Sequence, residues 1–199
     1  MVYILTDIDD VLNNLIADFL ENIKKMYHLK NQDIFLEKEN CKVNYYELKK
    51  VFTKKVYNLF KKMTADKFFM SSFLSTDFCR FLTKVVSYND IKVKVITSRK
   101  KAMKGVTLDW LHTYLFPTID RKTLEYLVVF CKREEKIPIV ECEQPDAYFD
   151  DDSFILEKLK ERKVYKGGLY ISNRAWNVLS CEENLSTFSH KLKVVLNYE

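Results

Sequence analysis

Apolar and polar positions repeat along the chain with two different periods, which predict strands and helices in turn. Residues 1–5, MVYIL, form a short β-branched and aromatic run that predicts a buried strand. Residues 11–27, VLNNLIADFLENIKKMY, repeat apolar side chains on one helical face and predict an amphipathic helix. Asp7, Asp9 and Asp10 therefore lie in the turn between the end of a strand and a helix.

The same alternation continues to about residue 173. We expect helices at 74–88, 104–116 and 153–162, with Ser75 or Thr76 capping the first of them. We expect strands at 91–98, 125–130, 146–150 and 167–173. Strands that alternate with helices are typical of a parallel, doubly wound sheet. The predicted fold class is therefore α/β, with a Rossmann-like three-layer α/β/α core and a mostly parallel sheet.

A change of texture interrupts this pattern at 28–67. The stretch begins polar and irregular and then becomes amphipathic at 47–63, ELKKVFTKKVYNLFKKM. We interpret 28–67 as a small helical cap inserted after the first strand-helix unit. The core domain would then comprise 1–27 and 68–199.

Polar clusters stand at the ends of three predicted strands: Asp7, Asp9 and Asp10; Thr97 and Ser98; and Asp150, Asp151 and Asp152. In an open α/β sheet, ligands bind at the carboxyl ends of the strands, so the clusters are expected to meet in one crevice. Adjacent carboxylates repel and call for a cation, and ligation by oxygen alone favours Mg²⁺. A carboxylate beside Mg²⁺ can attack phosphorus, and a second carboxylate can protonate the leaving oxygen.

Composition narrows the chemistry further. Only 3 glycines occur in 199 residues, and neither a P-loop nor a dinucleotide fingerprint is present. The net charge of +5 is spread over scattered lysines, which favours a solvated surface over a nucleic-acid groove. The 5 cysteines have no zinc-site spacing, and the start lacks the features of a signal peptide, so we expect a reduced, cytoplasmic protein.

The motifs DIDDVL, VITS and YFDDD, in this order, resemble motifs I, II and IV of the haloacid dehalogenase-like phosphohydrolases. The resemblance covers the chain from Val2 to about Asn177. Within that superfamily the chain looks most like the 5'(3')-deoxyribonucleotidases. The stretches KFFMSSF, TSRKKAMKGVTLDWL, CKREEKIPIVECEQPDAYFDDD and NRAWN carry this finer likeness.

The resemblance implies roles for individual residues. Asp7 would be the nucleophile and Asp9 the general acid/base, with Thr97 and Ser98 binding the phosphoryl group. Asp7, the Asp9 carbonyl and Asp150 would ligate Mg²⁺, supported by Asp151. The alternative metal pair, Asp151 and Asp152, is left open. Lys136 would be the lysine that neutralises the phosphate, and Lys132, Lys101 and Lys104 are alternatives for this role. Arg133 and Lys101 would bind the substrate. Phe68 and Phe69 would contact the nucleobase.

Two positions depart from the family pattern. Asp10 stands where a glycine is usual, and Leu15 stands where an aromatic residue would contact the base. Each implied role also has a structural alternative: the aspartates, Thr97 and Ser98 could cap helices, Phe68 and Phe69 could be core residues, and Lys136 could lie on an exposed helix face.

The sequence thus predicts a Mg²⁺-dependent phosphatase that hydrolyses nucleoside, chiefly deoxyribonucleoside, monophosphates through an aspartyl-phosphate intermediate. The alternatives are a phosphatase for another small phosphate ester or for a nucleic-acid 3'-phosphate end, and a non-catalytic binding module. The expected partner is a small phosphorylated molecule. Neither a membrane nor nucleic acid is expected, and a homodimer is left open.

Overall fold

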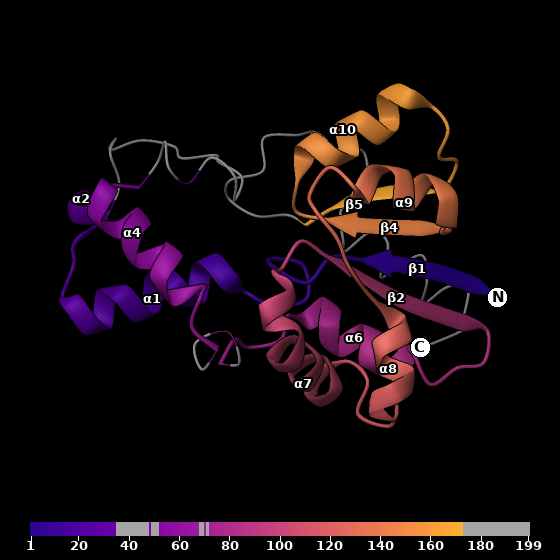
Figure 1. Ribbon diagram of the computed structural model, residues 1–199, viewed down its shortest axis with the longest axis horizontal. Helices are drawn as coiled ribbons and strands as arrows, with labels where there is room; N and C mark the ends of the chain where they lie inside the picture. The colour runs from indigo at the N-terminus through magenta and orange to yellow at the C-terminus, as the bar shows by residue number, and fades with distance from the viewer. Residues whose placement is uncertain (35–47, 49–51, 68–69, 71, 173–199) are drawn as a thin grey trace.

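A computed structural model describes residues 1–34, 48, 52–67, 70 and 72–172. Five parallel strands form one sheet in the order β3-β2-β1-β4-β5 (Figure 1). Their bounds are β1 Val2–Thr6, β2 Ile91–Thr97, β3 Val128–Phe130, β4 Ala147–Asp150 and β5 Gly168–Ile171. The sheet confirms the predicted α/β class.

Helices cover both faces of the sheet and make the three layers. Figure 1 shows α6 Asp77–Val85, α7 Lys104–Tyr114 and α8 Arg121–Leu127 on one face. It shows α9 Lys136–Glu143 and α10 Ser153–Arg162 on the other, and the short helix η2 Lys101–Met103 precedes α7.

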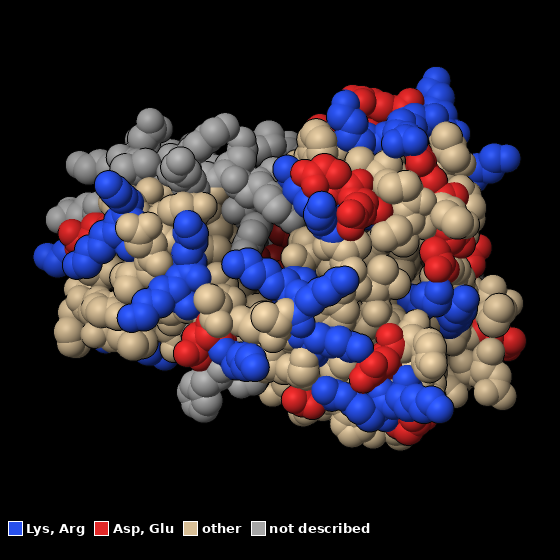
Figure 2. All heavy atoms as spheres, in the orientation of Figure 1, with Lys and Arg blue, Asp and Glu red and all other residues tan. Residues whose placement is uncertain are grey.

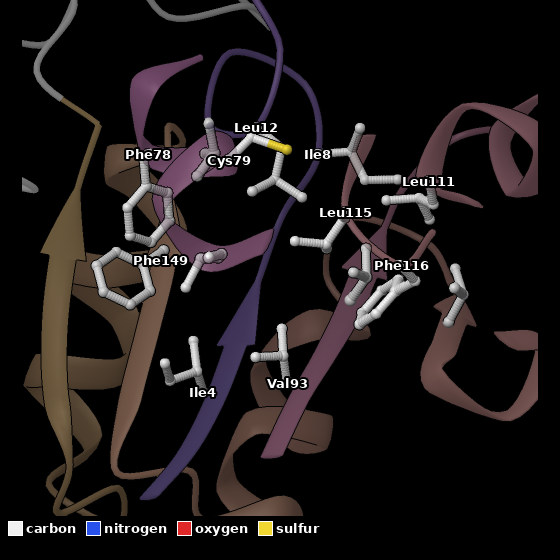
Figure 3. Packing of buried hydrophobic residues seen from close by; sticks show 14 of the residues in the cluster. Ile4, Ile8, Leu12, Phe78, Cys79, Val93, Leu111, Leu115, Phe116 and Phe149 are labelled. Atoms are coloured by element: carbon white, nitrogen blue, oxygen red, sulfur yellow. The ribbon is translucent and has the colours of Figure 1, made fainter. Parts of the chain in front are cut away.

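Alternation along the strands divides the core between these faces. Ile4 packs with α6 and α7 in one buried cluster, whereas its neighbour Leu5 packs with α9 and α10 in another. Figure 3 shows the first cluster, in which Ile4 and Val93 lie below Phe149, Leu115 and Phe116 in this view. Successive side chains of a strand point to opposite faces, so a run such as 2–6 must be apolar throughout to be covered on both sides.

The predicted elements agree with the structure in most places and differ at three. The first helix, α1, is Leu15–Tyr27 and begins later than residue 11. The strand expected at 125–130 was wrong for 125–127, because these residues form the end of α8. Asp120 caps the start of that helix, where its carboxylate accepts a hydrogen bond from the Thr123 amide. Helix α9 was not predicted. Of the two predicted caps, Ser75 and Thr76, it is Thr76 that caps α6.

A third buried cluster lies apart from the sheet. It joins α1 to α2 Asn31–Ile34 and α4 Lys54–Met63, where Phe19 packs edge-on against Phe60 with ring centroids 4.9 Å apart. The cluster continues through Met70 and Phe73 to Met103. The boundaries 28–67 stay a prediction, and the packing shows α1 sharing its apolar face with the cap helices.

Candidate active site

The carboxyl ends of β1, β4 and β2 bring the polar clusters to one edge of the sheet. Asp7 follows β1 directly, and its amide donates a hydrogen bond of 2.8 Å to the carbonyl of Phe149 in β4. Asp150 ends β4 and Thr97 ends β2. Figure 1 shows the arrowheads of β1 and β4 pointing toward the side where α1 and α4 lie.

Lys136 lies at the centre of this edge. Its Nζ is 2.7 Å from Oδ2 of Asp7 and 2.9 Å from Oδ2 of Asp150, and the side chain is only 1% exposed. The hydroxyl of Tyr148 also donates to Asp150. Because Lys136 is the first residue of α9, the helix that sequence analysis missed is the element that delivers this cation.

Asp7, Asp150 and Asp151 form a buried acidic centre. One carboxylate oxygen from each lies within 4.8 Å of the others. Burial, with the Asp150 and Asp9 charges, raises the pKa of Asp7 to about 7 although Lys136 opposes the rise. Burial and the charges of Asp150, Asp10 and Asp7 likewise raise the pKa of Asp151 well above its ordinary value.

This acidic centre has the donors that a hard divalent cation requires. All three residues offer oxygen, and Oδ1 of Asp7 is buried without a hydrogen-bond partner among the residues that the structure describes. A bound Mg²⁺ would relieve the mutual repulsion of the carboxylates and take up that oxygen. The residues therefore fit the metal that the sequence predicts.

Asp152 is engaged elsewhere. Its carboxylate accepts from Nε of Arg133 at 2.5 Å and from Nη2 at 2.8 Å, and it also accepts from the amide of Phe154 at the start of α10. Of the two metal pairs left open, Asp150 and Asp151 are thus the ones gathered beside Asp7.

Asp9 is held away from the acidic centre by a residue that sequence analysis did not single out. Arg99 donates from Nε and Nη2 to the two oxygens of Asp9, at 2.9 and 2.5 Å, and Asn13 donates to Oδ1 at 3.0 Å. Burial tends to raise the pKa of Asp9, but the charge and hydrogen bonds of Arg99 outweigh it and lower that pKa. The position of Arg99 in the sequence could have indicated its role, because it follows Thr97 and Ser98 at the end of β2.

Asp10 has a structural reason to replace glycine. Its φ is 56°, in the left-handed region that glycine enters freely and that aspartate tolerates best among charged residues. Its Oδ1 accepts from the amide of Ile16 at 3.1 Å in the first turn of α1. The aspartate therefore supplies both the turn and a cap for the helix that follows it.

Thr97 and Ser98 lie differently at the end of β2. Thr97 is buried, and its Oγ1 accepts a hydrogen bond of 3.2 Å from the amide of Arg99. Ser98 is half-buried and lines the cavity beside the acidic centre. Their binding of a phosphoryl group stays a prediction, and Ser98 is the one that faces open space.

The cavity measures about 500 Å³ and is lined by residues of the strand ends and by residues between 61 and 70. Asp7, Asp9 and Asp151 line it, as do the predicted Arg133 and the rival Lys132, whereas Lys101 does not. Lys104 pairs at the surface with Glu125 at 2.7 Å. Phe68 and Phe69 lie outside the described residues. Leu15 lines the cavity, as the predicted base-contact position requires.

Comparison with protein families shows which family the chain belongs to. Residues 1–178 match the model of the family described as 5' nucleotidase, deoxy (pyrimidine), cytosolic type C protein. The chain belongs to this family. It is therefore an enzyme, a phosphatase of the 5'-nucleotidase class with a haloacid dehalogenase-like fold, as its motifs predicted.

Solved structures resemble it only distantly. A haloacid dehalogenase-like hydrolase from Burkholderia xenovorans is 15% identical, with 85% of this chain and 83% of that chain covered and a TM-score of 0.46. A HAD-superfamily hydrolase from Geobacter sulfurreducens is 11% identical, with 86% of this chain and 89% of that chain covered and a TM-score of 0.45. The Legionella pneumophila effector Ceg4 is 13% identical, with 97% of this chain and 93% of that chain covered and a TM-score of 0.46. A search of curated proteins gives no match.

Proposed function

We propose that this nucleotidase is Mg²⁺-dependent and removes phosphate from deoxyribonucleoside monophosphates through an aspartyl phosphate on Asp7. The observation that carries the proposal is the contact of Lys136 with both Asp7 and Asp150 inside a buried acidic centre. A carboxylate is a weak nucleophile, and here a cation 2.7 Å away positions it and offsets its charge.

Asp7 and Asp9 carry out the two half-reactions. An oxygen of Asp7 forms a bond to phosphorus as the ester P–O bond breaks, and the leaving alkoxide takes a proton from Asp9. Asp9 must enter this step in its protonated form, against the lowering of its pKa by Arg99. Water then attacks the phosphorus of the aspartyl phosphate and gives its proton to Asp9, releasing phosphate and restoring the Asp7 carboxylate. Arg99 holds the Asp9 carboxylate at two points and so fixes its direction.

The metal would be held by Asp7, Asp150 and Asp151, whose oxygens already converge. The main-chain carbonyl of Asp9 stays the further ligand that the family resemblance implies. When bound, Mg²⁺ supplies positive charge to the transferring phosphoryl oxygens and keeps the carboxylates ionised. Ser98 and Lys132, which line the cavity, would bind the remaining oxygens.

The shape of the cavity favours a small ester. A volume of about 500 Å³, lined in part by Lys61, Thr64 and Lys67 of the cap, lies within the ordinary range for small-molecule sites. The family description names deoxy and pyrimidine substrates, which supports deoxyribonucleotides here. Family membership also favours catalysis over the alternative of a binding module.

Location and assembly stay predictions. No helix in the described parts of the chain has the length and apolar content needed to cross a membrane. Cys79, Cys131 and Cys142 are free thiols, in keeping with the reduced cytoplasm expected from the sequence. A homodimer remains an expectation to be tested by light scattering.

The deciding experiment measures phosphate release from deoxyribonucleoside and ribonucleoside monophosphates, with Mg²⁺ and with EDTA. We expect EDTA to abolish release, and Asp7→Asn to lower kcat by at least about 10³-fold because the nucleophile is lost. Asp90→Asn, which removes an exposed aspartate far along the chain, is the matched control and should retain activity. Metal-independent release, or full activity in Asp7→Asn, would refute the proposal.

A further inference from the structure

Four lysines line the cavity beyond the acidic centre: Lys61, Lys67, Lys100 and Lys132. All four are exposed, and none has a carboxylate within ion-pair distance among the described residues. Lys104, which does not line the cavity, is by contrast paired with Glu125. Figure 2 shows Lys and Arg side chains gathered on this face where the cap helices meet the core.

The other cavity charges are already matched. Arg99 is paired with Asp9 and Arg133 with Asp152. Within the acidic centre, Lys136 and the divalent cation of the proposed function would together balance the three carboxylates. The four lysines are therefore the charge available to a substrate.

That charge exceeds what one phosphate needs. A phosphate monoester carries about two negative charges at neutral pH, so about two lysines neutralise it. Lys100 and Lys132 follow strands β2 and β3 on the core side, where the phosphoryl group reacts. Lys61 and Lys67 belong to the cap side, at and beyond the end of α4. We call Lys61 and Lys67 the cap pair.

An apolar stretch accompanies the two charged ends of the cavity. Leu15, Met70 and Met103 line it, and each is at most 6% exposed. A cavity with a reacting centre, an apolar wall and a second cationic end complements a molecule with phosphate, a flat apolar group and another anion.

We propose that the substrate carries a second phosphate, and that the cap pair binds it. The class of substrate is a nucleoside bisphosphate, from which the acidic centre removes one phosphate while Lys61 and Lys67 hold the other. This inference rests on the proposed function and specifies its substrate. A cavity volume of about 500 Å³ favours this small molecule over a polynucleotide end.

The test compares kcat/KM for a deoxynucleoside 5'-monophosphate and the 3',5'-bisphosphate of the same nucleoside. We expect wild type to prefer the bisphosphate by about tenfold, the effect of two partly exposed charge pairs. In the double variant Lys61→Gln/Lys67→Gln, kcat/KM for the bisphosphate should fall about tenfold more than for the monophosphate. The preference should also shrink as salt rises.

The matched control is Lys54→Gln/Lys55→Gln. It also removes two positive charges, and it does so from the helix that carries Lys61, but these exposed lysines start α4 and do not line the cavity. It should keep the wild-type preference. Circular dichroism of both double variants checks that the fold is intact.

The outcomes separate this inference from the proposed function. Equal kcat/KM for the two nucleotides, or an equal effect of both double variants, would overturn the second phosphate site and leave the nucleotidase standing. Faster release from a 3'-phosphorylated oligonucleotide would overturn it in favour of a polynucleotide end. If neither nucleotide is hydrolysed, the proposed function fails, and calorimetric binding of both to Asp7→Asn decides the inference: tighter bisphosphate binding supports it, equal binding removes it.

Discussion

The acidic centre and the cap pair have opposite charges in opposite surroundings. Asp7, Asp150 and Asp151 are at most 5% exposed and depend on Lys136, whereas Lys61 and Lys67 are exposed and unmatched among the described residues. Buried charges must be partnered within the protein, since desolvation penalises each one alone. Exposed charges need no partner and remain available to a ligand. In the proposed function, the acidic centre reacts with one phosphate, and the cap pair selects the molecule that carries it.

The largest expected effect comes from breaking the centre. Lys136→Met keeps the length of the side chain and removes its charge, leaving Asp7 and Asp150 to repel each other. We expect the free energy of unfolding in EDTA at neutral pH to fall by about 3–5 kcal/mol, measured by urea denaturation. Activity should fall at least about 10²-fold.

Lys94→Met supplies the control for that comparison. Lys94 pairs with Glu143 at 2.8 Å, but both side chains are partly open to solvent. Its loss should cost about 1 kcal/mol or less. Equal costs for the two variants would mean that burial does not distinguish the acidic centre from the rest of the protein.

The second effect separates positioning from binding at Arg99. Arg99→Gln removes the two-point contact with Asp9. If Arg99 acts by orienting Asp9, kcat should fall about 10²-fold while KM changes little, because general acid–base catalysis depends on direction. A rise in KM at constant kcat would instead assign Arg99 to the substrate. Arg80→Gln, which removes an exposed ion pair with Asp77, should change neither constant.

The fold could be predicted closely because its signals are local. The run 2–6 is mainly apolar, and its composition predicts a buried strand directly, whereas 91–97 alternates lysines with buried apolar residues before its buried end. Helix α9 was missed because its residues 136–143 mix charged and apolar side chains with no clean periodicity and include Pro138 in the first turn. The start of α1 was placed too early because Val11 and Leu12 are apolar, yet they are buried within the turn.

The site was predictable to the extent that strand ends mark it. Lys136 and Asp7 meet across 129 positions of sequence, and only the strand order of a doubly wound sheet makes that meeting foreseeable. Arg99 was not foreseen, since an arginine after a strand is ordinarily exposed. Its burial follows from Asp9 and Thr107, which accept its hydrogen bonds.

The third prediction uses pH to compare wild type with Asp7→Asn in EDTA. The pKa of Asp7 is about 7 in the folded protein and near 3.8 when unfolded. Between these values the folded state binds the extra proton, so wild-type stability falls as pH rises, by at most about 1.4 kcal/mol per pH unit. Asp7→Asn lacks this pH-dependent loss, so its free energy of unfolding should rise relative to that of wild type from about pH 4 to about pH 7.

Mg²⁺ should reverse that trend in wild type. A cation binds the ionised carboxylates, so the rise in Tm on adding Mg²⁺ should be larger above pH 7 than below it, and small in Asp7→Asn. Thermal scans at several pH values measure both. A Mg²⁺ effect that is independent of pH and of Asp7 would place the metal outside the acidic centre.

The smallest effect concerns Asp10, which joins the two regions where the turn after β1 enters α1. Asp10→Ala loses the hydrogen bond to Ile16 and puts a residue without a local acceptor at φ 56°, so it should cost about 2 kcal/mol. Asp10→Gly loses the same bond but fits the backbone, and should cost about 1 kcal/mol. Asp10→Asn keeps an oxygen acceptor and should stay within about 0.5 kcal/mol of wild type. Urea denaturation of the three variants gives the order. If alanine and glycine cost the same, the left-handed backbone carries no strain, and the aspartate is there for its hydrogen bond alone.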